Sequence, residues 1–240
     1  MSAKRLTATQ RPSQIRRERE REAMRERILG AAHELFAERG IEAVTMRAIA
    51  DRIEYTATAL YFHFRDKEAL LRALLTDDFR LFAAQFQKVA TLKDPVARMR
   101  ASAKAFVAFG LTYPNHYRLM FMTPLSADPG LSAGPDIDQQ SPAEDAYTLL
   151  QAMVRDAASA GAIKPEFKDL ELVCQLLFSG LHGVVSIQLA HNIEGQNEHA
   201  RIQWRSSNKL RDAMCECLLA GIVTEDAISR SQKKSMEKRS

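Results

Sequence analysis

The chain has 240 residues and a hydrophobic content of 46%, enough for one large core or two modest ones, because domains commonly run to about 100–150 residues. Its formal net charge is +4, and much of its arginine lies near the amino end. Three cysteines, and a start without a charged head followed by an apolar run, argue against a secreted disulfide scaffold and predict a reducing, cytoplasmic compartment.

Residues 1–22 are predicted to form a basic charged arm. Arginine and glutamate alternate through its second half, as on a helix face exposed to solvent. Arg5, Arg11, Arg16 and Arg17 precede most of the acidic residues and fit a segment that contacts polyanions. Both interpretations stay open at this point.

Residues 23–80 have the periodicity of several helices, and no alternating strand pattern of useful length appears. Ile28, Ala32 and Leu35 share one apolar face of a first helix, and Gly40 supplies the left-handed position that commonly ends one. This helix would pack on those that follow.

Three hydroxyl or carboxylate residues predict the starts of the next helices. Thr45 can cap a short helix, Thr56 a second short one, and Asp66 a longer one. Two short helices joined by a tight turn after a longer helix form the helix-turn-helix arrangement.

The second short helix lies in the segment "TATALYFHFRDKEALL". A helical wheel predicts that Ile53, Ala57, Leu60 and Phe64 point inward. It places Thr58, Tyr61 and Phe62 outside, with His63 on the flank. Four successive aromatic rings cannot all point into one core, so the helix presents a tip of small residues followed by exposed rings, a shape that can enter the DNA major groove.

Residues 25 to about 75 resemble the amino-terminal DNA-binding domain of TetR-type (tetracycline-repressor-like) transcriptional regulators. The matching text is "ILGAAHELFAERGIEAVTMRAIA" followed by "ALYFHFRDKEALL". The resemblance implies that backbone and base contacts come from Thr45 and Arg47. It places the tip of the recognition helix at Thr56, Ala57, Thr58 and Ala59, and phosphate contacts at Tyr61, His63 and Lys67.

One departure from the family pattern lies in the turn, where the family commonly has Gly-Val-Ser and this chain has Glu54-Tyr55-Thr56. Glu54 must then adopt a left-handed conformation, at about 1–2 kcal/mol, or the turn must differ. Because the alanines of the tip offer methyl groups alone, Arg47 is the residue expected to contact guanine, with a phosphate contact or surface ion pair as the alternative.

Residues 81–226 predict a second helical domain. One helix ends before Pro114 and another begins there, residues 123–142 form a loop rich in Pro, Gly, Ser and Asp, and long helices cover 169–191 and about 208–222. The helix over 169–191 nearly reaches membrane-spanning length, but polar residues interrupt it. Its small residues predict a close helix contact, which we assign to a dimer interface: Ser179, Gly183 and Ser186.

The text "YPNHYRLMF" and the pair His182-Gly183 resemble one class of carboxy-terminal domain in this family. That resemblance implies a homodimer formed through the last two long helices and a small effector, probably apolar by composition of the site. The candidate lining is Phe106, Phe109, Tyr113, Tyr117, Phe121, Met122 and His182. Such residues are also common in ordinary cores.

The predicted fold is all-α: a three-helix helix-turn-helix DNA-binding domain followed by a helical effector-binding and dimerisation domain, with a disordered basic tail at 227–240. No catalytic triad or phosphate-binding glycine loop appears, so we expect no enzyme, no cofactor and no metal site. We expect a homodimeric repressor of a near-palindromic double-stranded DNA operator, without membrane association. The alternatives are a DNA-bound architectural or recruitment protein with a vestigial pocket, or a helical enzyme or carrier.

Overall fold

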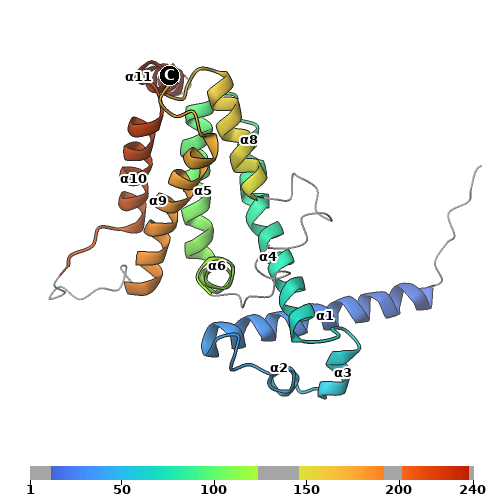
Figure 1. Cartoon of the computed structure of the whole chain (residues 1–240). Coiled ribbons are helices and arrows are strands. Elements are labelled where there is room, and N and C mark those ends of the chain that lie inside the picture. The colour runs from blue at the N-terminus through green and yellow to red at the C-terminus, as the bar shows by residue number, and fades with distance from the viewer. Residues whose placement is uncertain (1–11, 124–145, 192–201, 238–240) are drawn as a thin grey trace, which may run out of the picture. The chain divides into compact units, whose positions relative to one another are not determined.

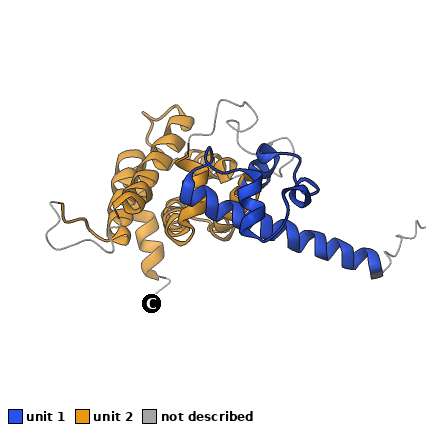
Figure 2. Cartoon of the chain, turned by 90° about the horizontal axis from the view of Figure 1, so that it is seen from below, with its two compact units in different colours: residues 1–74 blue, residues 75–240 orange. Residues whose placement is uncertain are grey.

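The computed structural model describes residues 12–123, 146–191 and 202–237. Within these ranges the regular elements are helices, apart from an isolated bridge between Ile163 and Val223 (Figure 1). This confirms the all-α prediction. The chain divides into two compact units, residues 1–74 and 75–240 (Figure 2), and the domain limits 23–80 and 81–226 remain our proposal beside that division.

The first unit contains α1 (Pro12–Arg39), α2 (Met46–Arg52), α3 (Ala57–Tyr61) and the first turns of α4 (Lys67–Ala90). Residues 12–22 of the predicted basic arm are the beginning of α1, and the side chains from 13 to 23 are exposed. Arg16 and Glu20 pair across one turn at 3.6 Å, with both side chains mostly in solvent. The charged, solvated helix face is therefore what the described part of the arm forms, and residues 1–11 lie outside the described residues.

The predicted helix caps of the first unit are confirmed. Thr45 Oγ1 accepts a hydrogen bond from the Ala48 amide and Thr56 Oγ1 from the Ala59 amide, each at 3.2 Å. Asp66 accepts one from the Ala69 amide at 2.7 Å. Each cap satisfies a backbone amide that the first turn of a helix leaves free.

Two residues of the first unit have positive φ angles where helices end or turn. Gly40 has φ 77°, and its amide donates to the Phe36 carbonyl at 2.9 Å, which closes α1 as predicted. Glu54 has φ 60°. The left-handed alternative for Glu54 is the one the chain adopts, at a conformational cost of about 1–2 kcal/mol.

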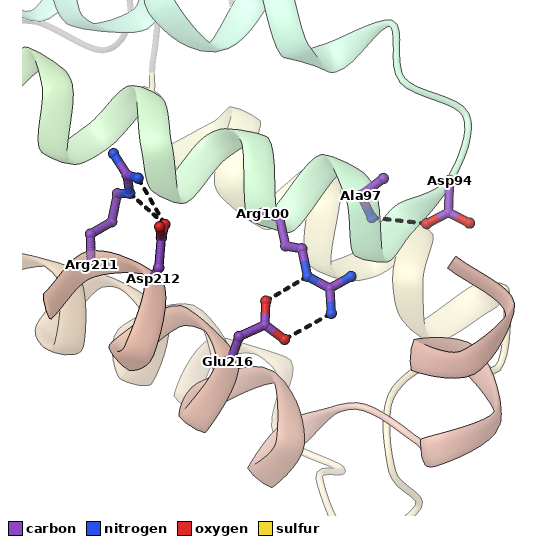
Figure 3. Close-up of polar contacts among 6 residues, drawn as sticks. All are labelled: Asp94, Ala97, Arg100, Arg211, Asp212 and Glu216. Atoms are coloured by element: carbon purple, nitrogen blue, oxygen red, sulfur yellow. Dashed lines mark hydrogen bonds and ion pairs between the residues drawn. The ribbon is translucent and has the colours of Figure 1, made fainter. Parts of the chain in front are cut away.

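The second unit contains the remainder of α4 and then α5 (Pro95–Thr112), α6 (Pro114–Phe121), α8 (Ala146–Ser159), α9 (Leu170–His191), α10 (Ser207–Ile222) and α11 (Glu225–Glu237). Asp94 caps α5 by accepting from the Ala97 amide at 2.8 Å (Figure 3). The break between α5 and α6 falls at Pro114, as predicted. Thr123 excepted, the predicted loop 123–142 lies outside the described residues.

Helix α9 is long and apolar enough to cross a membrane. It packs against α5, α8 and α10 (Figure 1), and Val173, Leu181 and Val185 on its inner side are buried. A helix at the centre of a bundle passes the same test of length and composition as a membrane span, so this feature is explained by the fold of the unit.

The disordered tail predicted for 227–240 is wrong for residues 227–237, which belong to α11. Ala227 and Ser231, one turn apart, are buried, and α11 packs on α5. Lys234 pairs with Asp94 at 3.7 Å. The basic composition hid an amphipathic face of small residues, which is why the tail was mistaken for a disordered one.

Candidate nucleic-acid interface and ligand cavity

The short helix α3 presents its predicted outer face to solvent. Thr58 is exposed, and the side chains of Tyr61 and Phe62 are 53% and 80% exposed. Leu60 is fully buried and Phe64 is nearly so. The wheel prediction is therefore confirmed for these residues, and Phe62 is the most exposed ring of the segment.

The tip of α3 consists of four small residues. Thr56 and Thr58 are exposed, whereas Ala57 and Ala59 are half-buried. Behind the tip, α3 packs on α2, where Ala50 has no exposed surface. A residue larger than alanine at this crossing would separate the two helices, so Ala50 allows α3 to lie close to α2.

Thr45 and Arg47 lie at the start of α2, and both are exposed. Arg47 forms no ion pair with another residue in the described ranges, unlike its neighbour Arg52, which donates to Glu34 and to Glu38 at 3.0 Å each. Of these two arginines on α2, Arg47 is the one whose guanidinium is available to an external partner.

Lys67 was predicted to contact phosphate, but the structure gives its ammonium group an internal role. Nζ donates to the carbonyl oxygens of Ile41 and Val44, at 2.7 and 3.0 Å. An ammonium group has three donors, so one remains. Lys67 holds the segment between α1 and α2, and its contact with phosphate stays a prediction.

Tyr61 and His63 occupy different positions at the carboxyl end of α3. The Tyr61 ring points into solvent, whereas His63 is half-buried and borders a shallow groove that Glu20 and Arg21 of α1 also line. Both groups can donate or accept hydrogen bonds. Their contacts with phosphate stay predictions.

Arg27, which the sequence did not single out, supports the turn before α3. Its Nη2 donates to the Ile53 carbonyl at 3.3 Å, and its guanidinium lies 5.4 Å from the centre of the Tyr55 ring. These contacts flank Glu54, the residue with the left-handed backbone. Spacing alone offered no signal for this role, because Arg27 is distant in sequence from the turn.

The second unit encloses a cavity of about 170 Å³ whose wall is almost entirely apolar. It lies among α4, α5, α6, α8, α9 and α10. Aromatic rings dominate one part of the wall, where Phe82 packs against Phe86, Phe106 and Phe121 with ring centres 4.9 to 5.6 Å apart. The arrangement suits an apolar molecule, because a buried apolar wall gives water few hydrogen-bond partners.

Two of the seven predicted pocket residues line this cavity, namely Phe106 and Phe121. The other five do not line it: Phe109, Tyr113, Tyr117, Met122 and His182. Phe109 is buried beside Phe82, and Met122 is exposed after the end of α6. For these five the prediction confused aromatic core with cavity wall, which have the same composition.

Tyr117 and His182 belong instead to a hydrogen-bonded chain between α6 and α9. Tyr117 Oη lies 2.7 Å from His182 Nδ1, and His182 Nε2 lies 3.0 Å from Ser186 Oγ. The imidazole also stacks between the rings of Phe178 and Tyr117. Burial lowers the pKa of His182 and raises the pKa of Tyr117, so both groups are neutral at pH 7.

The cavity residues that the sequence analysis missed come mainly from α4 and α8. Phe79, Phe82 and Phe86 line it from α4, and Tyr147 and Met153 from α8. The spacing of the three phenylalanines follows one helical face. That periodicity was present in the sequence, but it does not distinguish a cavity wall from a filled core.

The three cysteines do not form a reactive site. Burial raises the pKa of Cys174 and of Cys215 to about 11, which keeps both as thiols at neutral pH. Cys217 is exposed on α10. The expectation of buried thiols thus holds for two of the three.

Two family models match the chain. Residues 28–74 match the model described as "Bacterial regulatory proteins, tetR family", and residues 99–222 match "Tetracyclin repressor-like, C-terminal domain". The chain belongs to the TetR family. It is therefore a DNA-binding transcriptional regulator and not an enzyme.

Curated TetR-family relatives are similar over part of the chain. The HTH-type transcriptional activator FasR of Mycolicibacterium smegmatis is 30% identical over 131 residues, which are 54% of this chain and 60% of FasR. The HTH-type transcriptional regulator UidR of Escherichia coli is 38% identical over 69 residues, 29% of this chain and 35% of UidR. The aligned part thus spans less than two thirds of either relative.

Solved TetR-type structures share the fold along most of the chain. A TetR family transcription regulator from Marinobacter aquaeolei superposes with a TM-score of 0.65 at 22% identity, covering 87% of this chain and all of that one. The fatty acid degradation regulator FadR from Bacillus halodurans gives 0.65 at 16% identity, covering 82% and 98%.

The outward faces of α9 and α10 in this TetR-family protein carry small and apolar residues. Ser179 is exposed, and a side chain added at Gly183 would meet no atom within 4 Å. Leu172 and Leu176 on the same helix are 47% and 38% exposed. Ser186, the third residue predicted for the interface, is half-buried and engaged with His182.

Proposed function

We propose that this TetR-family regulator is a cytoplasmic, homodimeric repressor that binds a near-palindromic DNA operator and is released from it by a small, largely apolar effector. The observation that carries the proposal is the pairing of two features in one chain. One is the exposed tip of α3 in the first unit, and the other is the enclosed apolar cavity in the second.

The exposed residues of the first unit support operator binding. Thr45, Arg47 and the tip of α3 offer a basic group, hydroxyls and methyl groups, which match the groups that read base edges in the major groove. We assign the phosphate contacts to Tyr61, His63 and the third donor of Lys67.

The outward faces of α9 and α10 support a homodimer. Exposed apolar side chains beside small residues allow two copies of this helix pair to approach closely. Twofold symmetry then sets two α3 helices about 34 Å apart, one turn of the duplex, and selects a near-palindromic site.

The cavity supports control by an effector. Helix α4 begins in the first unit and lines the cavity in the second, so it is the segment that connects a filled cavity to the DNA-binding helices. A coupling of about 1–3 kcal/mol between the two sites is typical and sufficient for release. An apolar effector also agrees with the name of FadR as a fatty acid degradation regulator.

The test is a selection of bound DNA sequences with the full chain, repeated with a library of apolar small molecules. The proposal predicts enrichment of a near-palindrome and its loss with at least one compound. Enrichment that no compound changes would favour the architectural or recruitment protein with a vestigial pocket. Stronger binding with a compound would favour an activator, the description that FasR carries.

A further inference from the structure

We propose that the cavity of the second unit takes an uncharged, elongated apolar molecule with a carbonyl oxygen, and that Arg98 and Ser102 hold this oxygen. The inference rests on the proposed function, because it specifies the chemical class of the effector. It is carried by two polar residues in a wall that is otherwise almost wholly apolar.

Arg98 lines the cavity with a guanidinium group that is only partly satisfied. Its Nη1 donates to Asp156 Oδ2 at 2.8 Å, which fixes the position of the group. Its Nε is shielded from solvent and has no hydrogen-bond partner in the described part of the chain. Leaving such a donor unpaired costs about 1–3 kcal/mol, and a ligand with an acceptor oxygen removes this cost.

Ser102 follows Arg98 by one helical turn, so both lie on the same face of α5. Ser102 is 8% exposed, and its hydroxyl donates to the sulfur of Met153 at 3.4 Å. A thioether is a weak acceptor. A carbonyl oxygen, which has two lone pairs, accepts from both Nε of Arg98 and Oγ of Ser102 and is the better partner for each.

The charge balance favours an uncharged ligand. Asp156 already neutralises Arg98, since the two form an ion pair at 2.8 Å. A carboxylate would therefore bring an uncompensated charge into an apolar wall, at a large desolvation cost. A neutral carbonyl avoids this cost and still satisfies both donors.

The wall sets the shape of the ligand. Phe79 and Val89 both line the cavity from α4, and ten residues of helix rise about 15 Å. Arg98 lies in the first turn of α5, just after α4 ends, whereas Phe106 lies two turns further along and packs on Phe121. The oxygen thus belongs near Val89, and the apolar body extends toward the phenylalanines.

The probes are methyl octanoate and octanoate, titrated calorimetrically into the full chain without DNA. The two differ in charge and share the same hydrocarbon chain. Wild-type protein is expected to bind the ester more tightly than the carboxylate. Tighter binding of octanoate, or no binding of the ester, overturns the proposal.

Three variants assign the effect to residues. Arg98→Met should weaken binding of the ester about tenfold, equivalent to about 1.4 kcal/mol. Arg155→Met, which removes an exposed arginine of α8 outside the cavity wall, should leave it unchanged. Asp156→Asn keeps Arg98 but removes the neutralising charge, so affinity for octanoate should rise while that for the ester stays within a factor of about two, a difference well under 1.4 kcal/mol.

Wild-type affinity of Arg98→Met for the ester overturns the proposal, and so does an unchanged preference between the two probes in Asp156→Asn. The second variant keeps the test decisive if Arg98→Met fails to fold. Because the titrations contain no DNA, they separate the two ideas. Binding with the expected pattern but without operator release leaves this inference standing and removes effector control.

Discussion

Arg100 of α5 and Glu216 of α10 form a two-point pair: Nε lies 2.6 Å from Oε1 and Nη2 lies 2.9 Å from Oε2 (Figure 3). This parallel geometry joins two helices that both belong to the core of the second unit. Because each nitrogen faces its own oxygen, the pair fixes the rotation of α10 relative to α5.

Replacing Glu216 with Gln should lower the stability of the protein by about 1 kcal/mol, the upper range for a pair that is partly open to solvent. The hydrogen bond from Arg100 holds the pKa of Glu216 below its usual value. A lowered folded-state pKa stabilises the protein above the unfolded pKa of about 4.3 and loses its effect as pH falls through the folded value. Denaturation at pH 7 and pH 3 measures the difference between wild type and variant, which should disappear at the lower pH.

Arg47→Ala should relax the preference at one base pair in each operator half-site, at about 1–3 kcal/mol for a lost bidentate contact. Sequencing of DNA bound by wild type and variant measures it. Arg52→Ala provides the contrast, because Arg52 is paired with Glu34 and Glu38; it should change stability and leave the base preference intact. An identical operator profile for Arg47→Ala and wild type would show that Arg47 contacts phosphate or solvent instead.

Lys67→Met should destabilise the first unit as well as weaken DNA binding. The substitution leaves the carbonyls of Ile41 and Val44 without their donor, and a hydrogen bond from a charged group contributes about 1.5–3 kcal/mol. Chemical denaturation measures the first effect and a salt titration of DNA binding the second. Tyr61→Phe is the matched control, since the exposed hydroxyl should affect DNA affinity alone. Wild-type stability of Lys67→Met would contradict the internal role.

Gly183→Arg should disrupt the homodimer while leaving each protomer folded. An added side chain at this position meets no atom of its own chain within 4 Å, but it would keep two α9 helices apart. Sedimentation velocity should show a monomer, with weaker operator binding. Gly30→Arg changes another open helical glycine, in the first unit, and should remain dimeric. A dimeric Gly183→Arg protein would place the interface elsewhere.

Local signals in the sequence predicted the helices and their caps well. Thr45, Thr56 and Asp66 each begin a helix where their hydroxyl or carboxylate suggested, because a cap depends on neighbours within a single turn. The exposed face of α3 followed from helical periodicity for the same reason.

The cavity wall was harder to predict, because it depends on contacts between helices that are distant in sequence. Phe106 and Phe121 line it, but Phe109 does not, although all three are apolar rings on α5 and α6. Arg98 was missed since an arginine in the first turn of a helix is usually on the surface, and its burial arises from α8 packing beside α5. Composition alone cannot tell which rings surround a void.

The contact of α11 with α5 sets a practical limit on where the polypeptide can be shortened or extended. Ala227 and Ser231 cover α5, and Lys234 reaches Asp94, which caps its first turn. A recombinant version ending at Ile222 would uncover that turn. An affinity tag or fluorescent fusion attached after Glu237 would leave the buried side of α11 in place, since residues 232–237 are exposed.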